Sequence, residues 1–256
     1  MTRIARFEHG GSVRYGRWHD DGIAPFTSDP FTPSETAAEA SRLSADEVRL
    51  LAPVRPGKVL AVGRNYAEHA AELGNEVSAE PLVFLKPGSS VIGPNETVVR
   101  PSRTADLHHK AELAVVLSER CRNLPPDRVP EHVLGYTCAN DVTARDLQGP
   151  DRQWWRAKGS DTFCPLGPWI ETEPGTGSLA IGTIVNGETR QNGRTEHMVH
   201  GVAELVSHIS SAMTLEPGDV VLTGTPAGVG PLRPGDTVTV FVEGIGELTN
   251  PVESAS

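Results

Sequence analysis

Short apolar runs, each bounded by glycine, proline or polar turn residues, recur through most of the chain. Lys58–Gly63 and Leu82–Lys86 have the length and composition of buried strands. Glu112–Leu117 is apolar at every position after the glutamate, which is typical of a central strand covered on both faces. Val220–Thr223 and Val238–Phe241 are β-branched runs that each follow a Pro-Gly-Asp turn. The pattern predicts a strand-rich protein.

Two residue pairs predict tight β-hairpins. Gly-Gly and Asn-Gly tolerate the positive φ angles that two-residue hairpin turns require. Gly10-Gly11 lies between Ile4–Phe7 and Val13–Gly16, and Asn186-Gly187 lies between Ile181–Val185 and Thr189–Gln191. We therefore expect one hairpin at the N-terminus and another in the second half of the chain.

Helical periodicity is confined to a few segments. Thr195–Met213 predicts the one long amphipathic helix, with an apolar stripe made of Met198, Val202, Leu205, Val206 and Ile209. Shorter helices are expected at 34–43, 65–74 and 130–134. With so few helices among so many strands, the predicted fold class is α+β and strand-rich.

A change of composition divides the chain into two parts. Residues 20–45 are polar and carry Pro25, Pro30 and Pro33, whereas the apolar runs become frequent from Lys58 onward. We predict a small N-terminal domain at 1–55 and a main domain at 56–256.

Composition and charge narrow the function. The 26 glycines and 21 prolines fit a chain with many turns. A net charge of −10 disfavours nucleic acid as a partner, although a local basic pocket can still bind an acidic substrate. We expect no membrane span and a cytosolic location, because no apolar run has the required length and the first residues lack the apolar core of a secretory signal. The three widely spaced cysteines indicate neither a disulfide framework nor a zinc site.

Ionisable residues interrupt two of the apolar segments. On a helical turn His69 and Glu72 share a face, and a carboxylate beside an imidazole orients it as a general base. In the strand at 108–112, Lys110 and Glu112 point to one face and enter a buried run, where a charge needs a partner. Taken alone, His69 and Glu72 are better explained by a solvated helix face, whereas an exposed strand end explains Lys110 and Glu112 as well as a functional site does.

Three further segments combine polar or ionisable residues, and the first of them directly follows a predicted strand. They are Asn140–Gln148, Arg156–Phe163 and the glycine-rich Leu222–Gly230. The glycines of the last segment allow backbone amides to approach a small anion. It lacks the Gly-Lys-Ser/Thr of a phosphate-binding loop, so a nucleotide is not the expected ligand.

Taken in order, these segments resemble the fumarylacetoacetate hydrolase superfamily from about Lys58 to Phe241. The motifs that carry the resemblance are Gly63–Tyr66, Asn140–Asp146, Ala157–Gly159 with Asp161–Phe163, and Thr223–Gly230. The resemblance implies a β-roll or flattened barrel with a small N-terminal domain, assembled as a homodimer. It also implies an enzyme that acts on a 2-oxo or 2,4-dioxo acid through an enolate, by C–C hydrolysis, decarboxylation or keto–enol isomerisation.

The resemblance assigns roles to particular residues. Glu112 and Asp141 match carboxylate ligands of Mg²⁺ or Mn²⁺, and His69 and Glu72 match an acid–base pair on a mobile lid. Lys158 and Thr225 match residues that hold the carboxylate and oxo oxygens of the substrate, and Arg64, Tyr66, Arg145 and Gln148 match other residues of the pocket.

Lys110 departs from the family pattern, in which a glutamate completes a set of three carboxylates. A protonated lysine about 4 Å from a divalent ion is repelled by roughly 8 kcal/mol at an effective dielectric near 20, which is comparable to a micromolar binding free energy. Three arrangements follow. The ammonium replaces the metal and pairs with Glu112 and Asp141, acting as a catalytic charge. Alternatively, Lys110 turns away from a weakly held metal, or the site is inactive and the chain is a non-catalytic dimeric binding protein. A repurposed biosynthetic isomerase or cyclase on the same fold is a further alternative.

Overall fold

The computed structural model describes residues 2–31, 41–72, 74–175 and 177–255 and consists mainly of β-sheet. Its longest sheet has 11 strands, nine of which form one continuous path. In spatial order they are β3 (Gly22–Pro25), β2 (Ser12–His19), β1 (Arg3–His9), β13 (Cys164–Glu171), β11 (Val133–Asn140), β10 (Ala111–Leu117), β16 (Val220–Leu222), β5 (Val59–Gly63) and β6 (Leu82–Lys86). Two short strands join beside this path, β4 (Arg49–Leu50) on β1 and β7 (Val91–Ile92) on β13.

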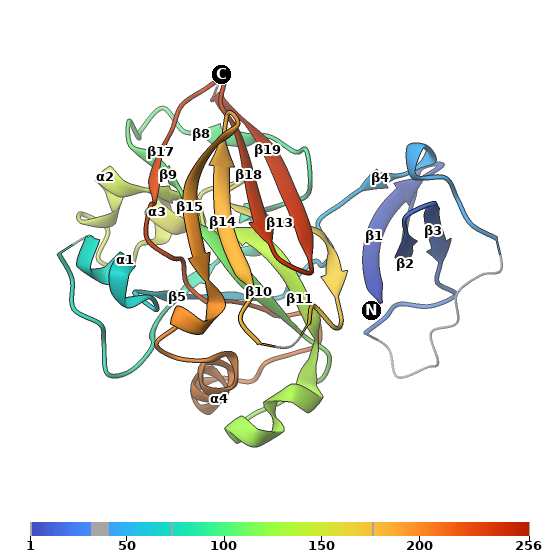
Figure 1. The fold of residues 1–256 in the computed structure, drawn as a ribbon, viewed down its shortest axis with the longest axis horizontal. Coiled ribbons are helices and arrows are strands. Elements are labelled where there is room, and N and C mark those ends of the chain that lie inside the picture. The colour runs from blue at the N-terminus through green and yellow to red at the C-terminus, as the bar shows by residue number, and fades with distance from the viewer. Residues whose placement is uncertain (1, 32–40, 73, 176, 256) are drawn as a thin grey trace.

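Two smaller sheets complete the fold (Figure 1). The five-stranded sheet runs β15 (Glu188–Arg194), β14 (Ala180–Val185), β18 (Thr237–Val242), β19 (Gly246–Ser254) and β8 (Val98–Arg100), and the three-stranded sheet runs β12 (Thr143–Ala144), β9 (Leu107–His109) and β17 (Gly230–Leu232). None of these sheets closes on itself within the described residues. The strand-rich α+β class predicted from the sequence is confirmed, as are the two hairpins, in which Phe7 pairs with Arg14 and Val185 with Glu188.

Strand β10 is buried along its whole length, as its apolar sequence predicts. Ala114 and Val116 pack into one apolar cluster, and Val115 and Leu117 pack into another. Ala111 and Leu113, near the start of the strand, contact residues of the five-stranded sheet. Because both faces of β10 are fixed by packing, the residues at its N-terminal end have little freedom to move.

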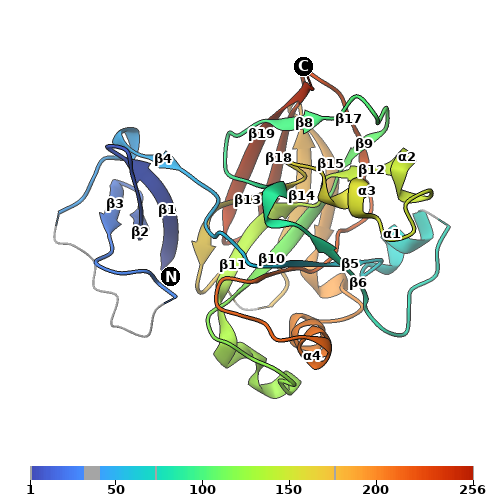
Figure 2. The ribbon, with the colours of Figure 1, turned by 180° about the vertical axis from the view of Figure 1, so that it is seen from behind.

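The helices are short. They are α1 (Ala67–Glu72), α2 (Arg145–Gln148), α3 (Trp155–Gly159) and α4 (Val202–Ala212), with 3₁₀ turns at Ala45–Glu47, Gly88–Ser90, Pro126–His132 and Thr195–His197. None in the described part of the chain is long and apolar enough to cross a membrane. Figures 1 and 2 both show α1, α2 and α3 grouped on the side of the molecule away from β1, β2 and β3.

Two of the predicted helices differ from the structure. The helix expected at 195–213 begins only at Val202, because Met198 has an extended backbone and forms a β-bridge with Tyr66. The helix expected at 130–134 is instead the end of a 3₁₀ turn (Pro126–His132) followed by the start of β11 at Val133, whose φ and ψ angles of −98° and 121° are extended. The helix expected at 34–43 lies mostly outside the described residues.

The N-terminal strands belong to the same sheet as the rest of the molecule. Arg3 and Ile4 of β1 pair with Glu171 and Ile170 of β13. The indole rings of Trp18 and Trp169 stack across this junction, with centroids 5.7 Å apart. The first strands therefore extend the main sheet at the edge far from α1.

Candidate functional site

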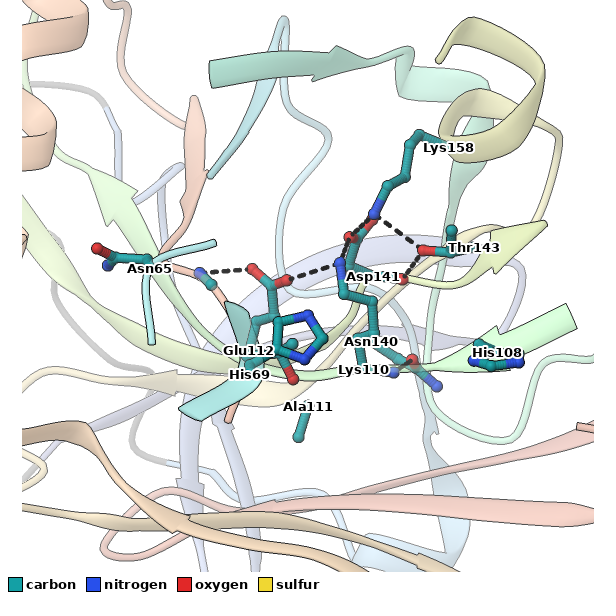
Figure 3. Close-up of polar contacts among 12 residues, drawn as sticks. Asn65, His69, His108, Lys110, Ala111, Glu112, Asn140, Asp141, Thr143 and Lys158 are labelled. Carbon is teal, nitrogen blue, oxygen red and sulfur yellow. Dashed lines mark hydrogen bonds and ion pairs between the residues drawn. The ribbon is translucent and has the colours of Figure 1, made fainter. Parts of the chain in front are cut away.

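A single buried carboxylate, that of Asp141, lies at the centre of the predicted site (Figure 3). Lys86 Nζ donates to its Oδ1 at 2.7 Å, and Lys110 Nζ donates to its Oδ2 at 2.7 Å. Lys158 Nζ also donates to Oδ2 and lies 2.9 Å from Thr143 Oγ1. The chain has only four lysines, so three of them converge on one aspartate.

The sheet brings these groups together from distant parts of the sequence. Lys86 ends β6, Lys158 lies on α3, and Lys110 lies between β9 and β10. The amide of Asp141 donates to the carbonyl of Lys110 at 3.0 Å, which holds the end of β11 beside the start of β10. Pairing between these two central strands therefore keeps the ammonium group of Lys110 close to the carboxylate of Asp141.

Burial and charge act in opposite directions on Asp141. Burial alone raises the pKa of a carboxyl group, but the charges of Lys110, Lys158 and Lys86 outweigh it and hold the pKa of Asp141 well below its usual range. The negative charge of Glu112 is less fully compensated by nearby cations. Its burial and the charge of Asp141 raise its pKa to about 7, although the charge of Lys110 partly offsets them.

The ammonium groups of Lys110 and Lys158 face a cavity of about 320 Å³. Arg64 and Arg145 contribute two more cations to its wall, and no carboxylate lines it. The lining residues are Gly63, Arg64, His69, Asn75, Phe84, Lys110, Arg145, Gln148, Gly149, Trp154 and Lys158. A small cationic pocket on an acidic protein is the arrangement that an anionic substrate requires.

A larger cavity of about 730 Å³ lies elsewhere in the molecule. Its walls include Leu113, Tyr136, Pro174, Met198 and Val202, and it contains none of the residues predicted for the site. The smaller cationic cavity is therefore the better candidate for chemistry.

The predicted base, His69, forms its expected pair. Its Nδ1 lies 3.2 Å from Glu72 Oε2 on helix α1, and the imidazole is 4% exposed. The Gly228 amide donates to Glu72 Oε1 at 3.1 Å, so the glycine-rich turn anchors the carboxylate that orients the ring. Burial and the charges of Lys110 and Arg145 lower the pKa of His69 to about 3. The ring is therefore neutral near pH 7 and able to accept a proton.

The glycine-rich turn also positions Glu112. The Gly224 amide donates to Glu112 Oε2 at 2.8 Å, and Gly224 has a φ angle of +97°. Next to it, Asn65 Nδ2 donates to the carbonyls of Thr223 and His200 at 2.7 and 2.9 Å. Sequence reasoning included Asn65 only as part of a motif, whereas the structure shows that it connects three segments behind the cavity.

The cavity brings together most of the predicted residues. Arg64, His69, Lys110, Arg145, Gln148 and Lys158 all line it, and Arg145 Nη1 donates to Gln148 Oε1 at 3.0 Å. Glu112 and Asp141 are fully buried and are not among the lining residues.

Two of the residues predicted to bind substrate lie outside this wall. Thr225 Oγ1 accepts a hydrogen bond from Gln191 Nε2 at 2.8 Å, so its hydroxyl already has a protein partner. Tyr66 is 2% exposed, and its hydroxyl has no hydrogen-bond partner among the described residues. Tyr66 instead borders a neighbouring cavity near Pro226 and Ala227.

Lys86 is the main residue that sequence reasoning missed. It ends an apolar strand, and its side chain is fully buried. Strand β6 lies at the edge of the sheet and is only partly buried, with Leu85 55% exposed, so its apolar sequence did not mark Lys86 as a buried charge that needs a partner. Phe84 and Trp154, which meet edge to face with centroids 5.5 Å apart, form an aromatic wall that the sequence also left unassigned.

The residues around Glu112 and Asp141 do not fit a tightly bound divalent ion. Lys110 turns toward the two carboxylates, with Nζ 2.7 Å from Asp141 Oδ2 and 3.9 Å from Glu112 Oε1. Both oxygens of Asp141 already accept hydrogen bonds from ammonium groups. Within the described ranges, no three His, Cys, Asp or Glu side chains gather as potential metal ligands. We therefore derive no catalytic step through a metal.

Comparison with known proteins agrees with this fold and shows the family to which the chain belongs. Residues 58–253 match the family described as fumarylacetoacetate (FAA) hydrolase C-terminal, and residues 2–53 match the family described as Rv2993c-like, N-terminal. The chain therefore belongs to the fumarylacetoacetate hydrolase family, and it is an enzyme of that family.

Three relatives illustrate the similarity. Protein Rv2993c of Mycobacterium tuberculosis is 50% identical over 80% of this chain and 79% of its own length. A mitochondrial Arabidopsis thaliana protein named oxaloacetate tautomerase FAHD1 is 43% identical over 77% of this chain and 91% of its own. The crystal structure of a 5-carboxymethyl-2-hydroxymuconate delta-isomerase from Mycobacterium smegmatis is 44% identical and matches with a TM-score of 0.92 over 99% of this chain and 100% of its own.

Replacing Gly224 by alanine tests how tightly the turn is packed. A Cβ at Gly224 would lie 2.7 Å from Asn65 Cβ, whereas one at Gly235, where φ is +95°, would meet nothing within 4 Å. We expect Gly235→Ala to lower the free energy of unfolding by about 1–2 kcal/mol through backbone strain alone. Gly224→Ala should cost about 1–3 kcal/mol more, because Asn65 must move. Urea denaturation measures both, and equal losses would show that Asn65 moves aside without cost.

The lowered pKa of His69 predicts a pH-dependent loss of stability. Below about pH 6.5 the unfolded chain gains a proton on this imidazole that the folded protein does not bind, so stability is complete above that pH and falls as the pH drops toward the folded pKa of about 3. His69→Gln should remove about 2 kcal/mol of the decrease in unfolding free energy between about pH 8 and pH 5. Buried His109, with a pKa of about 4, contributes the same slope in both proteins. Indistinguishable slopes in urea titrations would contradict a neutral His69.

Proposed function

We propose that this protein is a keto–enol tautomerase of a small 2-oxo dicarboxylic acid. The observation that carries the proposal is the composition of the 320 Å³ cavity, in which four cationic side chains and one neutral, carboxylate-oriented imidazole face the same space. Cations stabilise the negative charge of an enolate, and a neutral imidazole moves the proton that forms or consumes it.

The charge of the cavity supports a substrate with two carboxylates. The cavity wall has more cationic side chains than a substrate with one carboxylate and one oxo oxygen would require. They are Lys110, Lys158, Arg64 and Arg145. Arginine suits bidentate carboxylate binding, and lysine acts as a point charge. The plant relative is named for oxaloacetate and the mycobacterial structure for a carboxymethyl-hydroxymuconate, so both relatives are named for acids with more than one carboxylate.

The geometry suggests how the proton moves. With Nδ1 of His69 bonded to Glu72, the lone pair of Nε2 remains available as the base. It takes a proton from the carbon next to the oxo group. The electron pair of that C–H bond forms the new C=C bond, and the π pair of the C=O bond moves onto the oxo oxygen. The ammonium groups of Lys110 and Lys158 stabilise the resulting oxyanion, and the imidazolium returns its proton to that oxygen to give the enol. The reverse sequence gives the ketone.

The other reactions expected for the family share this enolate. Decarboxylation forms it by loss of carbon dioxide, and C–C hydrolysis forms it as a leaving group after water attacks a second carbonyl. A neutral base beside the cavity favours proton transfer, because tautomerisation requires only that base and an oxyanion site.

Exchange of His69 for glutamine tests the proposed reaction. Loss of the enol absorbance of oxaloacetate should be faster with the native protein than with buffer, and His69→Gln should lower kcat/KM by about 10²–10⁴-fold. Glu68→Gln is the matched control, because Glu68 is an exposed glutamate on the same helix and no hydrogen bond or ion pair joins it to His69 among the described residues. Turnover of an acylpyruvate alone would indicate a hydrolase, and binding of oxalate without any turnover would favour the non-catalytic alternative.

We also propose that the protein is a homodimer, as the resemblance to the family implies. Light scattering at micromolar concentration should give about twice the mass of the chain, and a mass equal to one chain would contradict it. The cytosolic location expected from the sequence stays a prediction that cell fractionation tests.

A further inference from the structure

We propose that the ammonium group of Lys110 takes the place of the divalent ion that the family's site is built to hold, so that this enzyme works without a metal. The proposal concerns the resting protein. Only the activity measurements rest on the proposed function, because metal binding is measured without any substrate.

The positions of the donor atoms carry the first part of the argument. Lys110 Nζ lies between the two carboxylates implied as ligands, 2.7 Å from Asp141 Oδ2 and 3.9 Å from Glu112 Oε1. Lys86 Nζ donates a hydrogen bond to Asp141 Oδ1, and Lys158 Nζ donates to Oδ2, which also accepts from Lys110. Glu112 Oε2 accepts from the Gly224 amide, which leaves Glu112 Oε1 as the one oxygen of the pair without a hydrogen-bond partner among the described residues. A metal needs several free oxygens.

The formal charge of the cluster carries the second part. Lys86, Lys110 and Lys158 with Glu112 and Asp141 leave an excess of one positive charge. A glutamate at position 110 would leave an excess of one negative charge, and a divalent ion would restore the single positive charge. The exchange of glutamate for lysine therefore supplies the same two units of charge that the ion would bring. Adding an ion to the native cluster would raise the excess to three positive charges in a buried site.

The position of the Lys110 side chain in the wall of the cavity is the third part of the argument. Lys110 and Lys158 line the cavity, whereas Glu112 and Asp141 are fully buried and do not. Lys110 Nζ has three hydrogens and makes one hydrogen bond to a carboxylate, so donors remain for a substrate oxygen. A bound 2-oxo acid thus meets a cation held in front of two carboxylates, which is the electrostatic surface that a metal would otherwise present.

The scarcity of lysine makes the proposal directly testable. A protein labelled with ¹³C only at the Cε atom of lysine has four labelled positions, one for each lysine, and exchange of single lysines assigns their signals. Paramagnetic Mn²⁺ bound at Glu112 and Asp141 would broaden the signals of Lys86, Lys110 and Lys158. The Lys58 signal is the internal reference, because Lys58 pairs with Asp219 at 2.6 Å rather than with Asp141. We expect no selective broadening in the native, chelator-treated protein at millimolar Mn²⁺.

Two variants at the same position provide the comparison. Lys110→Glu restores three carboxylates and should bind Mn²⁺ at least about a hundredfold more tightly than the native protein, with broadening of the Lys86 and Lys158 signals. Lys110→Met has a similar length and no charge, so its affinity should fall between the two. Thermal melting of each variant confirms that it is folded.

The outcomes are distinct. Selective broadening of the native protein at micromolar Mn²⁺, or native activity that a chelator abolishes and Mg²⁺ restores, would overturn the proposal. A folded Lys110→Glu protein that does not bind Mn²⁺ would also overturn it, because Lys110 would then not occupy a metal position. If Lys110→Glu does not fold, the native measurements decide alone. Absence of tautomerase activity would contradict the proposed function and leave the metal result unaffected.

Discussion

The convergence of three ammonium groups on the buried carboxylate of Asp141 is the interaction on which the site depends. Removing the Asp141 carboxylate would leave three buried ammonium groups with only Glu112 to compensate them, which costs far more than a surface ion pair contributes. Asp141 therefore determines where Lys110 and Lys158 point, and through them the electrostatic potential of the cavity. Burial lowers the pKa of His69, and the charges of Lys110, Arg145 and Lys158 lower it further, so the imidazole and the cationic wall are electrostatically linked.

The cluster lies at the ends of strands β10 and β11, in the centre of the main sheet. Strand β10 is buried on both faces, and the amide of Asp141 bonds the carbonyl of Lys110 at its start. The glycine-rich turn after β16 then contacts both halves of the site, through Gly224 to Glu112 and through Gly228 to Glu72. The His69–Glu72 pair on short helix α1 is thereby connected to the glycine-rich turn by a hydrogen bond from the Gly228 amide.

Much of this arrangement could be predicted from the sequence, and the failures have physical causes. Strand β10 and both hairpins follow from apolar runs and turn residues, which are local signals. The helix at 195–213 was predicted too long because a periodic stripe does not reveal that Met198 pairs with Tyr66 across the chain. Spacing also cannot reveal that Gln191 engages Thr225, or that Lys86 reaches Asp141, because both contacts depend on tertiary structure.

The distribution of lysine has a consequence for the chemistry of the protein surface. With Lys86, Lys110 and Lys158 almost fully buried, Lys58 is the one lysine whose side chain is substantially accessible, at 29% exposure. Acylating and glycating reagents, which attack free amines, thus find a single lysine target on the folded chain, while the many arginines keep the surface charged. The same residues that make the cavity cationic leave Lys58 as the one substantially accessible lysine, so a label attached to a lysine side chain would report from one defined place.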